Sequence, residues 1–362
     1  MKKSDKRLMR GTEAIGEAAI RSGCKCYFGY PITPQNELTE YMARRMTETG
    51  RVFLQSESEL AAINMVMGAS TTGARVMTSS SSPGISLKQE GISFIAPMEL
   101  PAVIVNVMRG GPGLGNIAPS QGDYFQATRG GGHGDYRTIV LAPASVQELF
   151  DLTRKAFDLA DEYRTPVLIL ADGMMGQMME PVVFKDRPVE PEELPEKSWT
   201  LTGAKDRPSR MIRSLLLDVN VEEEQNWRLY RKYQKISKRE VKCEELYMNG
   251  AEMAVVAYGT ASRIAKAAVK KCIEKNMKVG LIRPISLWPF PENVILERTR
   301  HIDHFMSFEM STGQMVEDVR LAVNGKAEVS VYGRPGGVVP TPAELYRVIS
   351  RTYNKMKREK EK

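Results

Sequence analysis

Histidine and cysteine are scarce in this chain. Its 362 residues include only three histidines and four cysteines. A Ser-His-Asp triad would have to use His133, His301 or His304, and the serine run before Gly84 lacks the G-x-S-x-G turn that presents a nucleophile. The cysteines are not grouped like the four thiolate ligands of an iron–sulfur cluster. We therefore expect neither a nucleophilic triad nor a metal or cluster site in this chain.

Long apolar runs are missing as well. No stretch reaches the ~18 apolar residues that suggest a membrane-spanning helix, and the basic N-terminus does not lead into the apolar segment of a signal peptide. The net charge of +7 comes without a basic patch interleaved with aromatic residues, which disfavours a nucleic-acid partner. These features predict a cytoplasmic protein with free thiols and no membrane contact.

The sequence motifs that bind phosphate groups are also absent. The glycine-rich segment Gly110–Asn116 contains G-x-G but not G-x-G-x-x-G, and no Walker A string occurs anywhere in the chain. A phosphate-binding α/β enzyme of another class is therefore disfavoured, because no phosphate loop can be recognised.

What the chain does contain is an alternation of apolar strands with helices. Near-continuous apolar strands between helices indicate an α/β fold with a parallel sheet covered on both faces. We expect a first domain at residues 1–185, then a linker with a charged helical arm at 186–248. A smaller α/β domain is expected at 249–362.

Several loops that follow predicted strands are rich in Gly, Pro, Ser or Thr. In open α/β sheets the ligand lies outside the carboxyl ends of the strands, so these loops are expected to form one cleft. An arginine directly after an apolar strand, Arg109, suits a carboxylate ligand because its planar fork can bind both oxygens. The side chains expected in the cleft are Thr33, Glu57, Glu59, Ser81, Ser82 and Arg109.

The sharpest single candidate is Glu59. It opens a helix that is apolar on almost every side up to Ser70, and such a helix is expected to be buried. Glu57, just before the helix, suits an exposed carboxylate at a helix start. Glu59 is harder to place, because an isolated buried carboxylate is costly. A ring nitrogen of a cofactor is one partner that would suit it.

Long motifs give the chain a family resemblance. The segments include "GYPITPQNELTEYM", "ESELAAINMVMGAS", "TSSSSPGISLKQEGISF" and "VIVNVMRGGPGLGNIAPSQGDYFQATRGGGHGDYR". They resemble the alpha subunit of 2-oxoacid:ferredoxin oxidoreductases, which use thiamine diphosphate, and the likeness covers nearly the whole chain. It is closest to the branched-chain type acting on 2-oxoisovalerate, although the relatives that act on 2-oxoglutarate share much of the pattern. The resemblance implies a pyrimidine-binding domain followed by a transketolase C-terminal-like domain.

The resemblance also implies roles for individual residues. Glu59 is the catalytic carboxyl that shares a proton with the aminopyrimidine ring of thiamine diphosphate. Pro31 and Ser82 belong to the same cofactor-binding surface. Thr33 and Arg109 face the carboxylate of the 2-oxoacid, which is decarboxylated oxidatively, with coenzyme A taking the acyl group and ferredoxin the electrons.

Thiamine-diphosphate enzymes hold the diphosphate through Mg²⁺ with a G-D-G motif and a later asparagine. Only partial look-alikes occur here, at Ala171–Gly173 and His133–Asp135. We therefore expect a beta subunit to supply the Mg²⁺ and diphosphate half of the site. A gamma subunit and a ferredoxin-like delta subunit are expected beside it, and the 4Fe-4S clusters are expected on the partner subunits. Alone, this chain is expected to be inert.

Two alternatives remain open from the sequence. One is the 2-oxoglutarate enzyme, which would need a second cation near the distal carboxylate of its substrate, whereas a branched-chain acid needs an apolar pocket. The other is a non-catalytic binding protein that has kept the fold.

Overall fold

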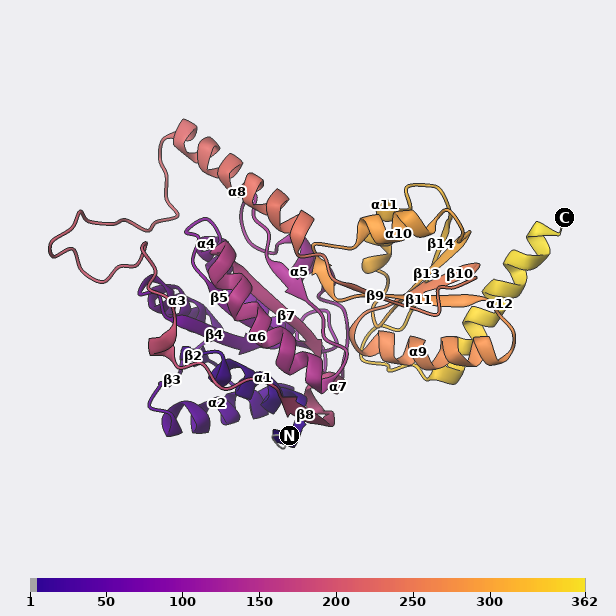
Figure 1. Cartoon of the computed structure of the whole chain (residues 1–362), viewed down its shortest axis with the longest axis horizontal. Coiled ribbons are helices and arrows are strands. Elements are labelled where there is room, and N and C mark those ends of the chain that lie inside the picture. The colour runs from indigo at the N-terminus through magenta and orange to yellow at the C-terminus, as the bar shows by residue number, and fades with distance from the viewer. Residues whose placement is uncertain (1–4, 362) are drawn as a thin grey trace.

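The computed structural model describes residues 5–361 and shows two lobes (Figure 1). The larger lobe is built on a seven-stranded sheet in the order β12-β6-β7-β5-β4-β2-β3, counted over the described residues. Its strands are parallel except β12, which pairs antiparallel with β6 at one edge. The strands are β2 (Cys24–Gly29), β3 (Val52–Gln55), β4 (Arg75–Ser80), β5 (Ala102–Met108), β6 (Ile139–Leu141), β7 (Pro166–Asp172) and β12 (Ser286–Trp288).

Helices cover both faces of this sheet. Strands β4, β5 and β7 are buried along their whole length, as the continuous apolar runs predicted. Helix α1 packs on α2 and α6, and α3 packs on α4. The helices are α1 (Gly11–Arg21), α2 (Asn36–Glu48), α3 (Glu59–Thr71), α4 (Ser82–Ile95), α5 (Tyr124–Arg129), α6 (Val146–Tyr163) and α7 (Gly173–Gln177).

A small antiparallel sheet joins the start of the chain to the end of the larger lobe. It pairs β1 (Asp5–Arg10) with β8 (Met179–Phe184). The sequence pattern did not predict it, because the basic segment before α1 shows no apolar alternation.

The segment between the lobes forms an arm. After a short 3₁₀ turn, η1 (Pro191–Glu193), the chain runs through a long loop into the charged helix α8 (Val219–Arg239), which projects from the larger lobe (Figure 1). Leu229, Tyr233 and Ile236 are the buried residues of α8, and they attach it to the core. The helix ends earlier than the charge pattern indicated, and Cys243–Leu246 form strand β9 of the smaller sheet.

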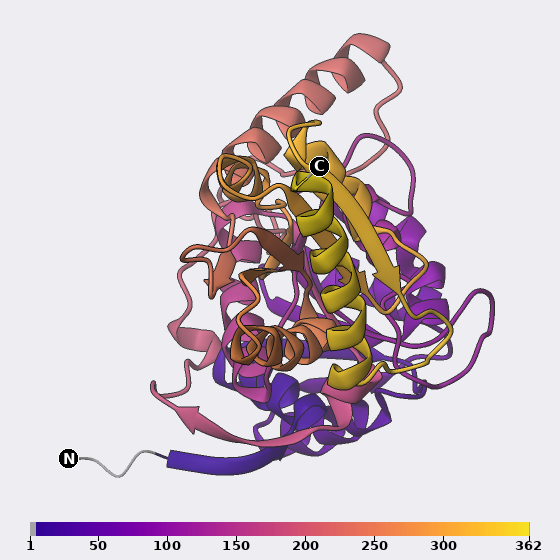
Figure 2. The same cartoon turned by 90° about the vertical axis from the view of Figure 1, so that its right-hand side faces the viewer.

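The smaller lobe holds a five-stranded sheet in the order β14-β13-β10-β11-β9, counted over the described residues and parallel except for β9. Helix α12 packs on α9 and runs along the outer side of this lobe (Figure 2), while α10 packs on α11. Its further elements are β10 (Met253–Val256), α9 (Gly259–Glu274), β11 (Val279–Pro284), α10 (Glu292–Arg298), β13 (His304–Glu309), α11 (Met315–Val323), β14 (Glu328–Gly333) and α12 (Pro342–Lys360).

The two lobes are joined by a strand and by hydrogen bonds. Strand β12 follows β11 in the chain but adds to the sheet of the larger lobe. The side chain of Gln121 donates to the backbone oxygen of Tyr258 and accepts from the backbone nitrogen of Met310. Over the described residues, no helix has the length and apolar character that would let it cross a membrane.

Candidate functional site

The predicted cleft lies at the carboxyl edge of the large parallel sheet. Strands β3, β2, β4, β5 and β7 are successive parallel neighbours, so the loops that follow them meet at one edge. Thr33, Glu59, Ser82 and Arg109 each follow one of these strands. The structure therefore brings together the residues that the sequence singled out.

Glu59 is the first residue of α3 and is buried, with 4% of its surface exposed. The helix begins here because the Ser58 hydroxyl accepts the backbone N–H of Ala61. The Ser80 hydroxyl, at the end of β4, donates to Glu59 Oε1 at 3.3 Å. Glu57 is exposed, as expected, and its carboxylate accepts the Ser58 hydroxyl. The prediction that Glu59 is the buried carboxylate of the pair is confirmed.

Helix α3 itself is only partly buried. Ala62, Ile63 and Val66 lie in the core, but Leu60 is 44% exposed on the opposite side. The prediction that the helix is buried all round is therefore wrong for this chain alone. Its apolar outer side is covered by none of the described residues.

Glycine at position 84 permits the close contact between α4 and Glu59. A Cβ added there would lie 2.0 Å from Ser80 Oγ and 2.3 Å from Glu59 Oε1. Both distances are far below van der Waals contact, so any side chain would push the carboxyl away. Sequence reasoning quoted Gly84 within a motif but assigned it no role.

A lysine stands on the same side of α4, one turn further on. Lys88 is fully buried, and its ammonium donates to Thr78 Oγ1 at 3.1 Å and to the backbone oxygen of Glu59 at 3.4 Å. Burial lowers the pKa of Lys88 to about 7, and the charge of Glu59 acts in the opposite direction. Sequence reasoning missed this residue. The available signal was a lysine at helical spacing among the small and apolar residues Gly84, Ile85, Gly91 and Ile92.

Ser82 takes part in a buried network that holds the loop after β5. Its hydroxyl donates to Asp123 Oδ2 at 2.6 Å and accepts the backbone N–H of Arg109 at 3.0 Å. Asn106 also donates to Asp123 Oδ2, and its own side-chain oxygen accepts the Ser82 N–H. Burial raises the pKa of Asp123, while these two side-chain hydrogen bonds lower it. The hydroxyl of Ser82 is thus committed to protein groups, and the binding of cofactor by this residue stays a prediction.

Arg109 joins two of the loops. Its guanidinium donates to the backbone oxygens of Thr33 at 2.9 Å and Leu114 at 3.0 Å. Its Nε is buried and has no partner among the described residues. The structure brings Arg109 and Thr33 together as expected, but through the backbone of Thr33. Their contact with a substrate carboxylate stays a prediction.

Thr33 and Pro31 are exposed on the loop after β2. Thr33 lines a cavity of about 760 Å³ at the sheet edge. None of the described residues that line this cavity is a lysine or an arginine, and apolar side chains dominate it. The lining residues are Thr33, Pro34, Asn36, Glu37, Ile117, Pro119, Gly173, Met174, Gln177 and Met178. Such a cavity suits an alkyl group better than a second carboxylate.

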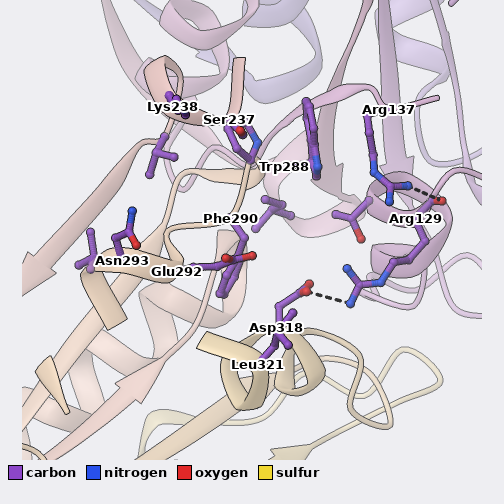
Figure 3. A pocket seen from close by; sticks show the side chains of 15 residues that line it. Arg129, Arg137, Ser237, Lys238, Trp288, Phe290, Glu292, Asn293, Asp318 and Leu321 are labelled. Atoms are coloured by element: carbon purple, nitrogen blue, oxygen red, sulfur yellow. Dashed lines mark hydrogen bonds and ion pairs between the residues drawn. The ribbon is translucent and has the colours of Figure 1, made fainter. Parts of the chain in front are cut away.

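A different cavity, of about 580 Å³, lies where α5, α8 and β12 meet α10 and α11 (Figure 3). Arg129 faces Asp318 across it at 2.8 Å, and Arg137 donates to the backbone oxygen of Arg129. Among the described residues that line it, none belongs to the predicted site. Its two arginines are already engaged by protein groups, so we place the candidate site at the sheet edge instead.

The donor set at Glu59 fits an organic ring rather than a metal. Within residues 5–361, no donor reaches Glu59 Oε2, which leaves this oxygen for a partner from outside the chain. No group of three or more described His, Cys, Asp or Glu residues is arranged to hold a metal ion. The Asp172 of the partial metal motif instead caps α7, where it accepts the N–H groups of Met174 and Met175.

Comparison with known proteins decides the family. Residues 17–248 match the model of the thiamine-diphosphate-binding part of pyruvate flavodoxin/ferredoxin oxidoreductases. Residues 251–345 match core domain II of pyruvate:ferredoxin oxidoreductase. The chain belongs to the pyruvate flavodoxin/ferredoxin oxidoreductase family. The resemblance to the alpha subunit of 2-oxoacid:ferredoxin oxidoreductases is thereby confirmed.

Two members of this family share about half of their residues with the chain. Ketoisovalerate oxidoreductase subunit VorB of Methanothermobacter marburgensis is 52% identical, over 94% of this chain and 96% of its own. The VorB of Methanothermobacter thermautotrophicus is 51% identical over 91% and 93%. A more distant relative is the 2-oxoglutarate synthase subunit KorA of Methanocaldococcus jannaschii, at 36% over 94% and 98%.

Two solved structures share the fold. The 2-oxoglutarate:ferredoxin oxidoreductase of Magnetococcus marinus superposes with a TM-score of 0.82 at 24% identity, over 97% of this chain and 66% of that longer chain. A split-gene transketolase superposes with a TM-score of 0.60 at 14% identity, over 96% and 98%. The predicted fold class, a thiamine-diphosphate-type parallel α/β unit followed by a smaller transketolase-like α/β unit, is confirmed.

Proposed function

We propose that this chain is the alpha subunit of an enzyme that oxidatively decarboxylates a branched-chain 2-oxoacid, with ferredoxin as electron acceptor and coenzyme A as acyl acceptor. The observation that carries this proposal is the cavity beside Thr33, which is lined mainly by apolar side chains and by no described cation. The VorB relatives, which are named for ketoisovalerate and share about half of their residues with the chain, support the same substrate class.

Glu59 is proposed as the catalytic residue. Its buried carboxyl keeps Oε2 free to share a proton with the aminopyrimidine nitrogen of thiamine diphosphate, while Ser80 fixes Oε1. When bound, the cofactor supplies the electron sink for decarboxylation. Glu59 sets the protonation of the ring, and the core residues of α3 keep water away from the carboxyl.

Thr33, Pro31, Ser82 and Arg109 are proposed to border the same cleft. Thr33 lines the apolar cavity, so its hydroxyl suits the substrate carboxylate while the alkyl chain occupies the cavity. Arg109 holds the loop of Thr33 in place through its backbone oxygen. Its charge, close behind that loop, favours an anionic substrate.

We propose partner subunits because this chain does not supply the half of the site that binds the diphosphate and Mg²⁺. A beta subunit would bring the Mg²⁺ and diphosphate half and would cover the exposed side of α3 around Leu60, which the exposed Val52 and Leu54 of β3 extend. A gamma subunit and a ferredoxin-like delta subunit with 4Fe-4S clusters would complete the complex. The four free cysteines suit the reducing cytoplasm as its location.

The test is a dye-reduction assay on the reconstituted complex with thiamine diphosphate, Mg²⁺ and coenzyme A. We expect 2-oxoisovalerate to give a higher kcat/KM than either 2-oxoglutarate or pyruvate. Activity confined to 2-oxoglutarate would support the sister enzyme. A complex that assembles but turns over none of the three would support a non-catalytic binding protein.

A further inference from the structure

A fully buried lysine lies directly behind the proposed catalytic carboxylate. Lys88 has no exposed surface, yet the described residues offer its ammonium no carboxylate at ion-pair distance. Within the part of the chain that the structure describes, it donates only to the Thr78 hydroxyl and to the backbone oxygen of Glu59. A buried charge with so few partners is expensive, and an apolar side chain of the same length would fill the space without that cost. The lysine therefore calls for an explanation beyond packing.

Two elements, strand β4 and helix α4, hold Lys88 next to Glu59. Thr78 and Ser80 lie two residues apart on β4, so their side chains point to the same face. Thr78 accepts from Lys88, and Ser80 donates to the carboxyl of Glu59. On α4, Gly84 and Lys88 are four residues apart and so share one side of the helix. Glu59 thus lies against Ser80 of β4 and against Gly84 and Lys88 of α4, while Thr78 holds the ammonium of Lys88.

The electrostatics make the two groups interdependent. Burial disfavours the charged form of Lys88 and lowers its pKa to about 7, and Glu59 is the titratable group whose charge opposes that shift. An ionised Glu59 favours the ammonium form of Lys88, because the two charges are opposite and the site is buried.

We propose that Lys88 is a positioning residue for Glu59: it fixes the first turn of α3 and stabilises the carboxylate that forms when the Glu59 proton moves to the cofactor ring nitrogen. In this step the proton would pass from the Glu59 oxygen to the ring nitrogen, and no proton would move to or from Lys88. This inference rests on the proposed function, because it assigns Lys88 a role toward the same carboxyl.

The experiment compares Lys88→Met and Lys88→Arg with the unmodified chain in the assembled complex. The matched control is Lys232→Met, which removes a half-buried lysine that pairs with Glu99 instead. Two quantities are measured between pH 6 and 9. One is the number of protons exchanged on binding thiamine diphosphate, by calorimetry in buffers of different ionisation enthalpy. The other is kcat for 2-oxoisovalerate.

We expect Lys88→Met to change the proton count on cofactor binding and to lower kcat by roughly 10- to 100-fold with a displaced pH profile. Lys88→Arg should restore part of kcat, and Lys232→Met should leave both readouts unchanged. Combined with Glu59→Gln, the Lys88→Met substitution should add no further loss. An unchanged proton count with a pH profile parallel to that of the unmodified complex would overturn the inference.

The two proposals can fail separately. If the unmodified complex turns over no 2-oxoacid but Lys88→Met still alters the proton count, the positioning role survives and the proposed function fails. If the unmodified complex is active and Lys88→Met matches it, only the positioning role fails. If Lys88→Met does not assemble, Lys88→Gln decides, because a neutral hydrogen-bond donor that leaves the proton count and the pH profile unchanged would show that the charge of Lys88 plays no part.

Discussion

The Thr260 hydroxyl donates to Asp172 Oδ1 at 2.9 Å and so ties the start of α9 in the smaller lobe to the start of α7 in the larger one. The same carboxylate oxygen caps α7 by accepting two backbone N–H groups. Burial raises the pKa of Asp172, and its hydrogen bonds lower it. Since Met174 on α7 lines the proposed substrate cavity, this contact couples the junction of the lobes to the site.

Replacement of Asp172 by Ala should therefore disturb both stability and substrate binding. We expect the free energy of unfolding to fall by about 2–4 kcal/mol, because a cap is lost and buried donors are left unpaired. The KM for the 2-oxoacid should rise as α7 loosens. Urea unfolding and steady-state kinetics on the complex measure the two effects. Thr260→Val, which removes one bond and keeps the cap, should cost less in both.

Glu59→Gln should abolish 2-oxoacid-dependent dye reduction while the complex still assembles. An amide keeps the shape but cannot share a proton with the ring, and a positioned acid–base group is worth about 10²- to 10⁴-fold in rate. Glu57→Gln is the matched control and should retain turnover, because Glu57 is exposed and its carboxylate accepts a hydrogen bond from the neighbouring Ser58 hydroxyl. Near-normal turnover by the Glu59 variant would remove this residue from the mechanism.

Gly84→Ala should lower turnover, as the loss of Glu59 would, although the carboxyl group of Glu59 is still present. The new methyl group would collide with the Ser80 hydroxyl and the Glu59 carboxyl, and such overpacking costs about 1–3 kcal/mol. Gly91→Ala on the same helix is the matched control, because its methyl group would collide with Ile63 of α3 and not with Glu59. Turnover and thermal unfolding are compared; equal turnover by the two variants would contradict the close contact.

A cation placed in the apolar cavity should change substrate preference. Met174→Lys adds an ammonium where the cavity has none among its described lining residues. We expect kcat/KM for 2-oxoisovalerate to fall by roughly tenfold or more, because the alkyl chain would meet a charge. The value for 2-oxoglutarate should rise. Met174→Leu keeps the cavity apolar and should preserve the preference; identical ratios in both variants would place the substrate elsewhere.

The buried Lys88 predicts a pH dependence of stability. Its pKa falls from the usual 10.5 to about 7 in the folded chain, so between these values the unfolded chain binds more protons. Stability should therefore rise with pH across this window and decline as pH falls toward 7. At about 1.4 kcal/mol per unit the full effect is on the order of a few kcal/mol. Denaturant unfolding of the complex should show this slope, and Lys88→Met should flatten it.

Local patterns in the sequence predicted much of this site. The apolar run after Glu59 separated it from Glu57, and the strand-end rule collected Thr33, Ser82 and Arg109 at one edge. The features that these patterns did not show depend on contacts between residues that are far apart in the sequence. The bond between Ser82 and Asp123 spans 41 residues, and nothing in either segment signals it.

The same limit applies to the fold. The alternation of strands and helices predicted the parallel sheets but not the antiparallel pair of β1 and β8. These two strands come from the two ends of the sequence that forms the larger lobe. The burial of the outer side of α3 was predicted wrongly, because the sequence shows that this side is apolar but does not show which residues cover it. The cavity near Thr33 is lined by residues that follow three different strands, β2, β5 and β7. Its apolar character can therefore be seen only in the folded structure.

The placement of β12 has a consequence for synthesis of the protein. The sheet of the larger lobe gains this edge strand only once Ser286–Trp288 have left the ribosome, long after β7 has been made. Until then β6 presents an open edge, which invites pairing with other chains. A shortened chain that stops before β12 should therefore be prone to aggregation, and the two lobes are better regarded as one co-folding unit than as separable modules.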